Sequence, residues 1–375
     1  MNHELGRCAV ASALLFAAAG AVQAQSTVQV FGLIDLGVES VTNVGAGRGT
    51  LTRMPSLTGE LPSRLGLRGS EDLGGGLKAN FVLEAGLTVD AGGYAQGGRP
   101  WGRQALVGLS GALGSLSFGR QYTMLFWSIL DADLLGPNLY STGSLDAGVP
   151  NARADNAIAY KGTFGGLTVG ATWSLGRDAV NAGPSPAGTN CPGESTDSRA
   201  CREVSWMLKY DTPTWGLALA DDRQWGRAVG AAPDAVFGGL NRSDKVDRRL
   251  SANGWAKWGG VKLGAGLIRR HNDGDAVKPK SDLIYLEAAW QASPALVIDG
   301  GWMTLRYKSV ADVDATLVAL RATYSLSRRT AVYTQVGHIA NDARSAVSVS
   351  GGAGGSNPAP GVGQSGVNVG VRHVF

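Results

Sequence analysis

Apolar and polar residues alternate along much of the chain, in segments of about ten residues. In LKANFVLEAGLT (77–88), the odd positions from Leu77 to Leu87 are apolar, and the even positions are mostly polar or small. The same period of two recurs in LTVGATWSL (167–175) and TLVALRATYSL (316–326). Successive side chains of a strand point to opposite faces, so this period predicts strands with one apolar face. Such segments are typical of a β-barrel that crosses a membrane.

The connections between these segments alternate between tight turns and long loops. Tight turns are expected at 71–76, 111–114, 163–166, 212–216, 258–260, 292–294 and 327–329. Long polar or glycine-rich loops are expected at 41–60, 122–152, 175–202, 226–246 and 341–365. Outer-membrane barrels have short periplasmic turns and longer external loops, so this alternation favours that architecture. The last of these loops is rich in Gly, Ser and Pro, and we expect it to be mobile.

The pattern predicts an all-β fold, a transmembrane antiparallel β-barrel of about sixteen strands. The expected strands are 27–40, 62–70, 77–88, 103–110, 115–121, 153–161, 167–174, 203–211, 217–225, 247–257, 261–270, 282–291, 295–306, 314–326, 330–340 and 366–375. An even number places both chain ends on the periplasmic side, and a barrel of this size encloses an aqueous lumen. The alternative is a soluble exported β-sandwich, whose outward faces would be more uniformly polar.

The N-terminus resembles a secretory signal peptide. An apolar run, Ala9–Ala21, follows Arg7, and the small residues around Ala24 fit a cleavage site after it. Residues 1–24 are therefore expected to be removed, leaving 25–375 as a single barrel domain. The alternative interpretation of the run is a short buried helix. The rest of the chain has no apolar stretch long enough for a membrane helix, although glycine, at 56 of 375 residues, is about twice as frequent as usual.

Charge and cysteine content exclude several classes of protein. A formal net charge of +4, with no concentrated Lys/Arg tract, does not indicate nucleic-acid binding. Cys191 and Cys201 bound the polar segment CPGESTDSRAC, which favours a loop disulfide in an oxidising compartment. A metal site would need further ligands, and the histidines are scattered, so no metal is expected. Common catalytic motifs are missing as well, so we expect no enzyme activity, no catalytic residues and no cofactor.

Four stretches resemble one family. SRLGLRGSEDLGGGLKANFVLEAGL (63–87), FGLIDLGV (31–38), FGRQY (118–122) and the terminal Phe375 are similar to the general porins of Gram-negative outer membranes, most closely to the beta-proteobacterial branch. The resemblance implies a homotrimer in the outer membrane, among its lipid and lipopolysaccharide, that passes small hydrophilic solutes. It also implies a third long loop folded into each lumen, and a terminal Phe strand recognised by the assembly machinery.

The third long loop, 122–152, differs from the others in composition. It carries the apolar patch MLFWSIL (124–130), followed by Asp131, Asp133 and Asp146. An exposed patch of this kind would promote aggregation, whereas a loop folded against the inner wall would bury it and direct its carboxylates into the lumen. We therefore expect a constriction loop with an acidic side formed by these aspartates. The alternative is a loop that contacts another protomer or a partner.

By motif, the resemblance places Arg64, Arg120 and Arg153 on the basic side of the constriction. Arg64 shares a face with polar or small neighbours, which agrees with a lumen position. Arg120 instead shares parity with Leu116 and Phe118, so either the strand bulges near Gly119 or the lumen assignment is wrong. Opposed charges across a water-filled lumen select ions, and we expect weak anion selectivity.

Three alternatives to a general diffusion pore remain at this point. A substrate-specific channel for carboxylates or sugars is the nearest, and an adhesin and a barrel enzyme follow. The final strand, 366–375, argues for a barrel in each case, because a closed sheet must pair its last strand with its first. Val367, Val369 and Val371 should then face lipid, with Phe375 at the periplasmic interface as an assembly signal.

Overall fold

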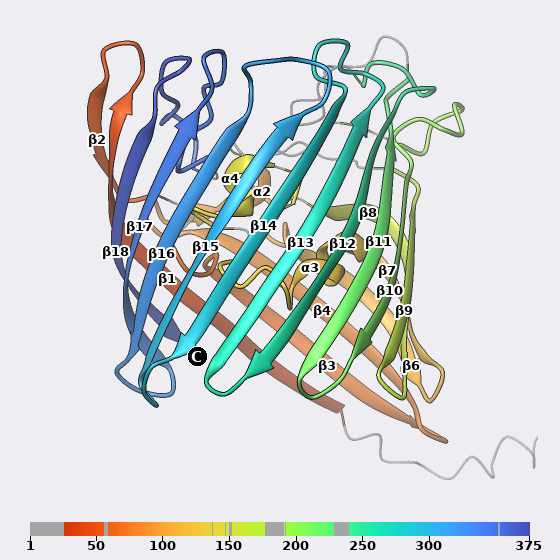
Figure 1. Ribbon diagram of the computed structural model, residues 1–375. Helices are drawn as coiled ribbons and strands as arrows, with labels where there is room; N and C mark the ends of the chain where they lie inside the picture. Colours follow the sequence, from red (N-terminus) through yellow and green to blue (C-terminus); the bar gives the residue numbers. More distant parts are fainter. Residues whose placement is uncertain are drawn as a thin grey trace, which may run out of the picture.

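The structure is a computed structural model that describes residues 26–55, 59–136, 138–146, 148–149, 152–176, 191, 193–228, 240–351 and 353–375. The predicted signal peptide, 1–24, lies outside the described residues. Within the described part, sixteen long antiparallel strands form a closed barrel (Figure 1). They are β1 (Ser26–Val44), β3 (Arg64–Gly74), β4 (Leu77–Thr88), β6 (Gln104–Gly111), β7 (Gly114–Tyr122), β8 (Arg153–Phe164), β9 (Leu167–Ser174), β10 (Glu203–Asp211), β11 (Trp215–Trp225), β12 (Val246–Trp258), β13 (Val261–Asn272), β14 (Lys280–Gln291), β15 (Leu296–Tyr307), β16 (Ala315–Ser325), β17 (Thr330–Asn341) and β18 (Gln364–Val374). The predicted fold class is confirmed.

Strand β1 closes the barrel. Its first half pairs with β3, from Ser26 opposite Glu71 to Leu33 opposite Arg64, and its second half pairs with β18. The last residue also belongs to this seam, because the Phe375 amide donates to the Gly32 carbonyl at 3.1 Å and the Gly32 amide donates back at 3.2 Å. Backbone groups of the seam are thus paired within the sheet, as a strand in lipid requires.

The two faces of each strand follow the predicted alternation. In β18, Val367, Val369 and Val371 point outward and are 42–57% exposed, whereas Asn368 points inward and is fully buried. Outward positions elsewhere are also apolar, for example Val28 and Leu217, at 67% and 60% exposed. Apolar side chains that would be unfavourable in water form a continuous lipid-facing surface here.

Turns and loops lie at opposite ends of the barrel (Figure 1). Tight turns connect the strands at the end where the chain terminates, and Gly74, Gly75 and Gly76 in one of them have positive φ angles that favour glycine. Two short strands, β2 (Gly49–Arg53) and β5 (Gly93–Tyr94), extend the loops at the other end. The disulfide between Cys191 and Cys201 is present in the long connection between β9 and β10.

Among the described residues, helical structure is confined to short segments of the connections. They are α2 (Ala95–Gly98), α3 (Met124–Ile129) and α4 (Thr142–Leu145). None of the helices in the described residues has the length and apolar character needed to span a membrane.

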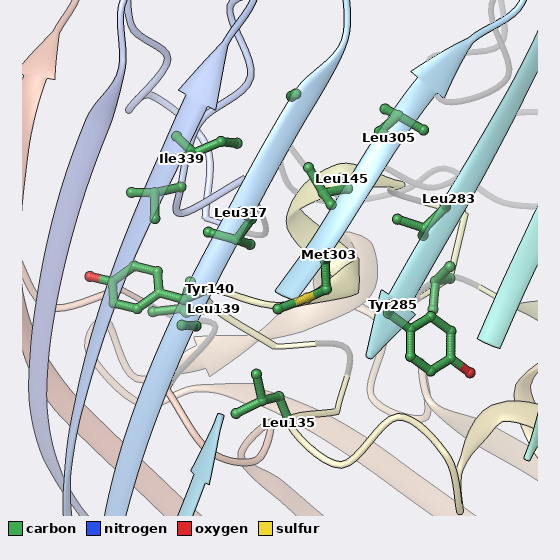
Figure 2. Close-up of a cluster of buried hydrophobic side chains, with 14 of the residues drawn as sticks. Leu135, Leu139, Tyr140, Leu145, Leu283, Tyr285, Met303, Leu305, Leu317 and Ile339 are labelled. Atoms are coloured by element: carbon green, nitrogen blue, oxygen red, sulfur yellow. The ribbon is translucent and has the colours of Figure 1, made fainter. Parts of the chain in front are cut away.

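The third long loop, 122–152, folds into the barrel and packs against its inner wall (Figure 2). Its residues Leu135, Leu139, Tyr140 and Leu145 are at most 7% exposed. They contact inward side chains of five strands, namely Ile268, Leu283, Tyr285, Met303, Leu305, Leu317 and Ile339. Each fully buried side chain of this size contributes roughly 1.5–3 kcal/mol, which offsets part of the cost of ordering the loop. The predicted inward fold of this loop is confirmed.

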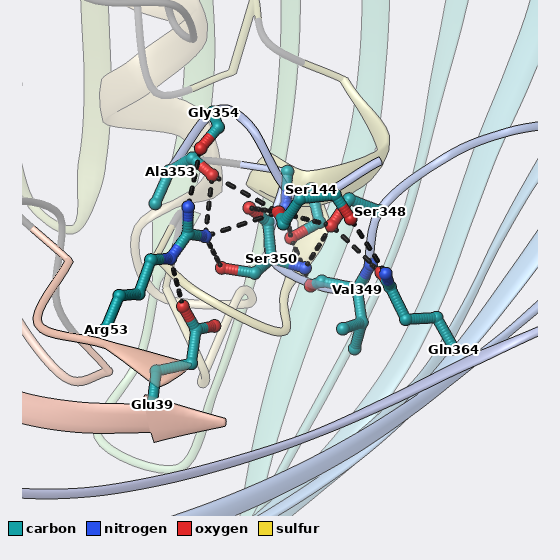
Figure 3. Close-up of polar contacts among 11 residues, drawn as sticks. Glu39, Arg53, Ser144, Ser348, Val349, Ser350, Ala353, Gly354 and Gln364 are labelled. Atoms are coloured by element: carbon teal, nitrogen blue, oxygen red, sulfur yellow. Dashed lines mark hydrogen bonds and ion pairs between the residues drawn. The ribbon is translucent and has the colours of Figure 1, made fainter. Parts of the chain in front are cut away.

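The connection between β17 and β18 covers the third loop from the long-loop end (Figure 3). Ser144 Oγ donates to the Val349 carbonyl at 2.8 Å, and Arg53 of β2 donates to the carbonyls of Ala353 and Gly354. The same guanidinium forms an ion pair of 2.8 Å with Glu39 on β1. Side chains from other elements therefore contact the described part of this connection, which its Gly/Ser/Pro-rich composition did not predict.

Candidate pore constriction

A cavity of about 1020 Å³ lies in the lumen between the third loop and the opposite wall. We call it the pore cavity. Seven arginines and four carboxylates line it, namely Arg53, Arg64, Arg68, Arg103, Arg153, Arg321 and Arg372 with Glu60, Glu84, Asp90 and Asp133. Many fixed charges thus face this cavity, among apolar residues that also line it, and such charges set ion preference in a water-filled channel.

Two arginines converge on one tyrosine at the wall facing the loop. Arg103 Nη2 and Arg153 Nη2 donate to the Tyr122 hydroxyl at 2.6 and 3.0 Å. The Arg153 guanidinium also lies 4.6 Å from the centre of the Tyr122 ring, which is a cation–π distance. The same ring stacks on Phe126 of α3, with centroids 3.9 Å apart. Tyr122 thus joins the barrel wall to the constriction loop.

Glu84 is the counter-charge of this cluster. Its Oε1 accepts from Arg103 Nε at 2.8 Å and lies 3.6 Å from Arg64 Nε. Gln104 Nε2 donates to the other carboxylate oxygen at 2.7 Å. One carboxylate therefore orients both Arg64 and Arg103. Arg53 and Arg321, by contrast, form ion pairs with Glu39 and Asp299.

Arg120 lies where strand register shifts between β7 and β8. Gly119 pairs with Ala157 and Gln121 with Ala154, so Arg120 lies opposite both Asp155 and Asn156. Gly119 has a φ of +117°, and a Cβ on it would lie 2.2 Å from the Ala105 carbonyl oxygen. A bulge of this kind re-aims side chains, and here it resolves the parity conflict at Arg120.

The bulge directs Arg120 into an ion pair instead of the pore cavity. Its Nη1 donates to Asp155 Oδ1 at 2.5 Å, and its Nε donates to the Gly102 carbonyl at 2.7 Å. Arg99 Nη1 forms a second ion pair with the same carboxylate, 3.3 Å from Asp155 Oδ1. Arg120 is not among the residues that line the cavity, whereas Arg64 and Arg153 are.

The aspartates of the loop occupy three different environments. Asp133 lines the pore cavity, accepts a hydrogen bond of 2.7 Å from Thr142 Oγ1, and lies within hydrogen-bonding reach of Glu287 on β14. Burial raises the pKa of the Asp133 carboxyl to about 6. Asp131 forms an ion pair with Lys209 of β10.

Asp146 is paired outside the pore cavity. Arg249 of β12 donates to both of its carboxylate oxygens, from Nε and Nη2, at 2.9 Å each. Burial alone would raise the pKa of Asp146, but Arg249 outweighs it and holds this pKa at about 2. Asp131 and Asp146 therefore fasten the loop to the wall, and among the three aspartates only Asp133 lines the cavity.

Two charged residues of the site were missed by motif comparison. Arg321 of β16 donates to the carbonyls of Leu134 and Leu135, and Glu287 accepts from the amides of the same two residues. In the alternating segment 316–326, Arg321 shares its face with Thr323 and lies opposite Val318 and Leu320, so parity was a signal that could have found it. In the described residues, no group of His, Cys, Asp and Glu side chains could hold a metal ion.

Comparison with known proteins agrees with this architecture. A family model described as Gram-negative porin matches residues 9–344. Outer membrane porin protein 32 of Delftia acidovorans is 30% identical, over 96% of this chain and 97% of its own. The chain belongs to the Gram-negative porin family. This porin is thus an integral protein of the outer membrane, and its barrel forms a water-filled channel for small hydrophilic solutes.

Further relatives support the assignment of this porin. An outer membrane porin protein of Bordetella pertussis is 29% identical, over 98% of this chain and 99% of its own. Among solved structures, the anion-selective porin from Comamonas acidovorans superimposes with a TM-score of 0.73 and 25% identity, covering 94% of this chain and all of the other. OmpT of Vibrio cholerae, at 14% identity and a TM-score of 0.62, shares the fold over 93% of this chain and 98% of its own.

Proposed function

We propose that this porin prefers anions, and that Arg64, Arg103 and Arg153 form the basic side of its constriction. One observation carries the proposal, namely that Arg64, Arg103 and Arg153 all line the pore cavity, on the wall where Glu84 pairs with Arg64 and Arg103. Fixed charges lining a water-filled lumen concentrate ions of opposite sign. One of the solved structures that resemble this chain is called an anion-selective porin.

On the acidic side, Asp133 faces the pore cavity, while Asp131 and Asp146 act by positioning the loop. Arg120 acts in the same way on the wall, through its ion pair with Asp155. The basic side of the proposed constriction therefore has three arginines, whereas its acidic side has one of the three aspartates, Asp133. This imbalance favours anions, with Arg68 adding positive charge to the cavity lining.

The test is the reversal potential of the purified porin in a planar bilayer that separates two KCl concentrations. We expect a potential whose sign shows that chloride is more permeant than potassium. A potential of the opposite sign would contradict the anion preference and leave the family assignment untouched.

A substrate-specific channel for carboxylates is the second candidate. Arginine forks bind carboxylates bidentately, and Arg103 and Arg153 lie on the cavity surface around Tyr122. Liposome swelling with a dicarboxylate and with neutral sugars of similar size distinguishes the two. Faster swelling with sugars would favour a general pore, and the reverse would favour a carboxylate channel. The fold and the family are those of a channel, so an enzyme or an adhesin is less well supported.

We also propose a homotrimer whose C-terminal strand is recognised by the assembly machinery. The outward face near the chain termini is uncharged and apolar, with Val28, Val30, Val367 and Val369 each exposed. Such a face suits contact with lipid or with another protomer. Native mass spectrometry of the detergent-extracted porin would give three copies if the proposal holds, and a single copy would contradict it.

A further inference from the structure

Three large apolar side chains are exposed inside the lumen, where they meet water instead of lipid. They are Met54, Tyr94 and Leu130, which are 53%, 50% and 40% exposed. All three line the pore cavity. Apolar side chains of similar exposure on the outer wall are covered by lipid, whereas contact between these three and water is unfavourable. Their exposure therefore indicates that they contact a solute with an apolar part.

The three side chains come from three different connections. Met54 directly follows β2, Tyr94 is the last residue of β5, and Leu130 directly follows α3. Neighbouring contacts fix the first two. Arg53 holds the segment of Met54 through its ion pair with Glu39 (Figure 3), and Tyr94 pairs with Leu87 of β4. The convergence of these connections on one cavity is therefore a property of the folded barrel.

Leu130 remains exposed although the residue before it is buried. Ile129 is 1% exposed, and its carbonyl accepts from the amides of Ala132 and Asp133 at 3.0 and 2.9 Å. The resulting turn packs Ile129 against the wall and leaves Leu130 at the surface of the pore cavity. The apolar patch 124–130 of the third loop is thus divided between the barrel wall and the pore.

The wall of the same cavity presents an arginine that can bind a carboxylate. Arg64 Nε lies 3.6 Å from Glu84 Oε1, and the guanidinium has no hydrogen-bond partner among the described residues. The Arg64 side chain is 25% exposed and lines the pore cavity. Both terminal nitrogens of a guanidinium can donate to one carboxylate, so Arg64 offers a bidentate site.

An aromatic ring lies beside Arg64 on the wall. Phe31 of β1 pairs with Gly66 of β3, and a Cβ on Gly66 would lie 2.3 Å from the Phe31 ring. The ring therefore covers the glycine between Arg64 and Arg68, and the Arg68 guanidinium lies 5.1 Å from its centre. Phe31 also lines the pore cavity. The carboxylate-binding group and an apolar surface thus adjoin on two paired strands.

This combination selects one chemical class of solute. Small-molecule sites are typically lined by apolar side chains with a few polar groups that fix the orientation of the ligand. A solute with one carboxylate and an apolar body would pair with Arg64 and cover the exposed side chains of Met54, Tyr94 and Leu130. A hydroxylated solute would instead lose hydration of its hydroxyl groups against the same side chains.

We propose that the pore cavity preferentially binds monocarboxylates that carry an apolar ring or chain. Arg64 binds the carboxylate, and Met54, Tyr94 and Leu130 contact the apolar body. The inference rests on the proposed anion preference of this porin and adds the class of organic anion to it. Binding must also be weak enough to let the solute leave, as passage through a channel requires.

The test measures how three ring compounds block the KCl current through the porin in a planar bilayer. Benzoate carries the charge and the apolar ring, benzamide has the same shape without the charge, and glucuronate has a charged but hydroxylated ring. Benzoate should halve the conductance at a concentration roughly tenfold lower than either of the others, because each lacks one of the two contacts.

Two variants locate the site of block. Met54→Gln with Leu130→Gln removes apolar surface from the pore cavity without changing its charge, and both side chains are exposed, so the fold should be retained. Leu113→Gln with Val277→Gln is the control, since these side chains are 80% and 61% exposed and do not line the cavity. The half-blocking concentration of benzoate should rise roughly tenfold in the cavity variant and stay unchanged in the control.

Three results would overturn the proposal. One is an equal half-blocking concentration for benzoate and glucuronate, and another is an equal one for benzoate and benzamide. The third is an unchanged benzoate block in the cavity variant. The reversal potential in a KCl gradient, recorded in the same membranes, separates this inference from the proposed function. Chloride preference without benzoate preference would refute only the class of solute, whereas potassium preference would refute the anion preference itself.

Discussion

The ion pair between Asp146 and Arg249 is expected to be the main polar fastening of the far end of the constriction loop. Replacing Asp146 by Asn keeps the size of the side chain and removes its charge, while Arg249 retains Asp247 as a partner at 3.2 Å. The carboxyl pKa falls from 3.8 to about 2 in the folded protein. Since one pKa unit corresponds to about 1.4 kcal/mol, the charge stabilises the folded state by about 2–3 kcal/mol at neutral pH.

The sign of the pH dependence follows from the lowered pKa. The stabilisation is complete above the unfolded pKa near 4 and is lost as the pH falls through the folded pKa of about 2. Urea unfolding of the porin in lipid vesicles at neutral pH measures the effect, and Asp146→Asn should lower the free energy of unfolding by about 2–3 kcal/mol.

A double-mutant cycle separates this pair from general disturbance of the loop. Arg249→Gln alone should destabilise more than Asp146→Asn, because it also leaves Asp247 with one partner fewer. The double variant should be more stable than the sum of the two single changes predicts, with a coupling of about 2 kcal/mol. Simple addition of the two effects would refute the reasoning, since it would mean that the two side chains do not interact.

Three further changes test other parts of the structure. Removing Phe375, whose backbone pairs with Gly32, should lower the yield of assembled barrel in the outer membrane without lowering export, as quantified by fractionation. Replacing Arg120 by Leu leaves Asp155 with only Arg99, and urea unfolding should show a loss of up to about 3–5 kcal/mol. Because the raised pKa of Asp133 makes the ionised carboxyl unfavourable in the folded state, the native porin should lose stability as the pH rises from about 4 through about 6, and Asp133→Asn should flatten that dependence. An unchanged yield of barrel without Phe375 would contradict the first prediction, and unchanged stability of Arg120→Leu would contradict the second. The third would be contradicted if Asp133→Asn left the pH profile of stability unaltered.

Much of the fold could be predicted because its signal is local. Alternation with a period of two is imposed on each strand separately by lipid on one side and water on the other, so it can be read without knowing the partner strand. The same reasoning placed the three valines of the last strand on the lipid face.

The site was less predictable because its chemistry depends on distant partners. Nothing near Asp131 or Asp146 in the sequence shows that Lys209 and Arg249 neutralise them from strands β10 and β12. The position of Arg120 depends on a register shift that two strands create together. For a related reason, the composition of the connection before β18 does not show that Arg53, some 300 residues away in the sequence, donates hydrogen bonds to it.

The reversal potential of the Arg64→Gln, Arg153→Gln variant, recorded beside that of the unmodified porin in the same KCl gradient, shows whether the arginine cluster sets the ion preference of the pore. These two arginines line the pore cavity, and their replacement leaves the loop anchors at Asp131 and Asp146 intact. We expect both proteins to form open channels, and we expect the variant's reversal potential to move from the chloride side towards the potassium side. An open channel with an unchanged reversal potential would contradict it, because the arginine cluster would then not set the charge of the constriction.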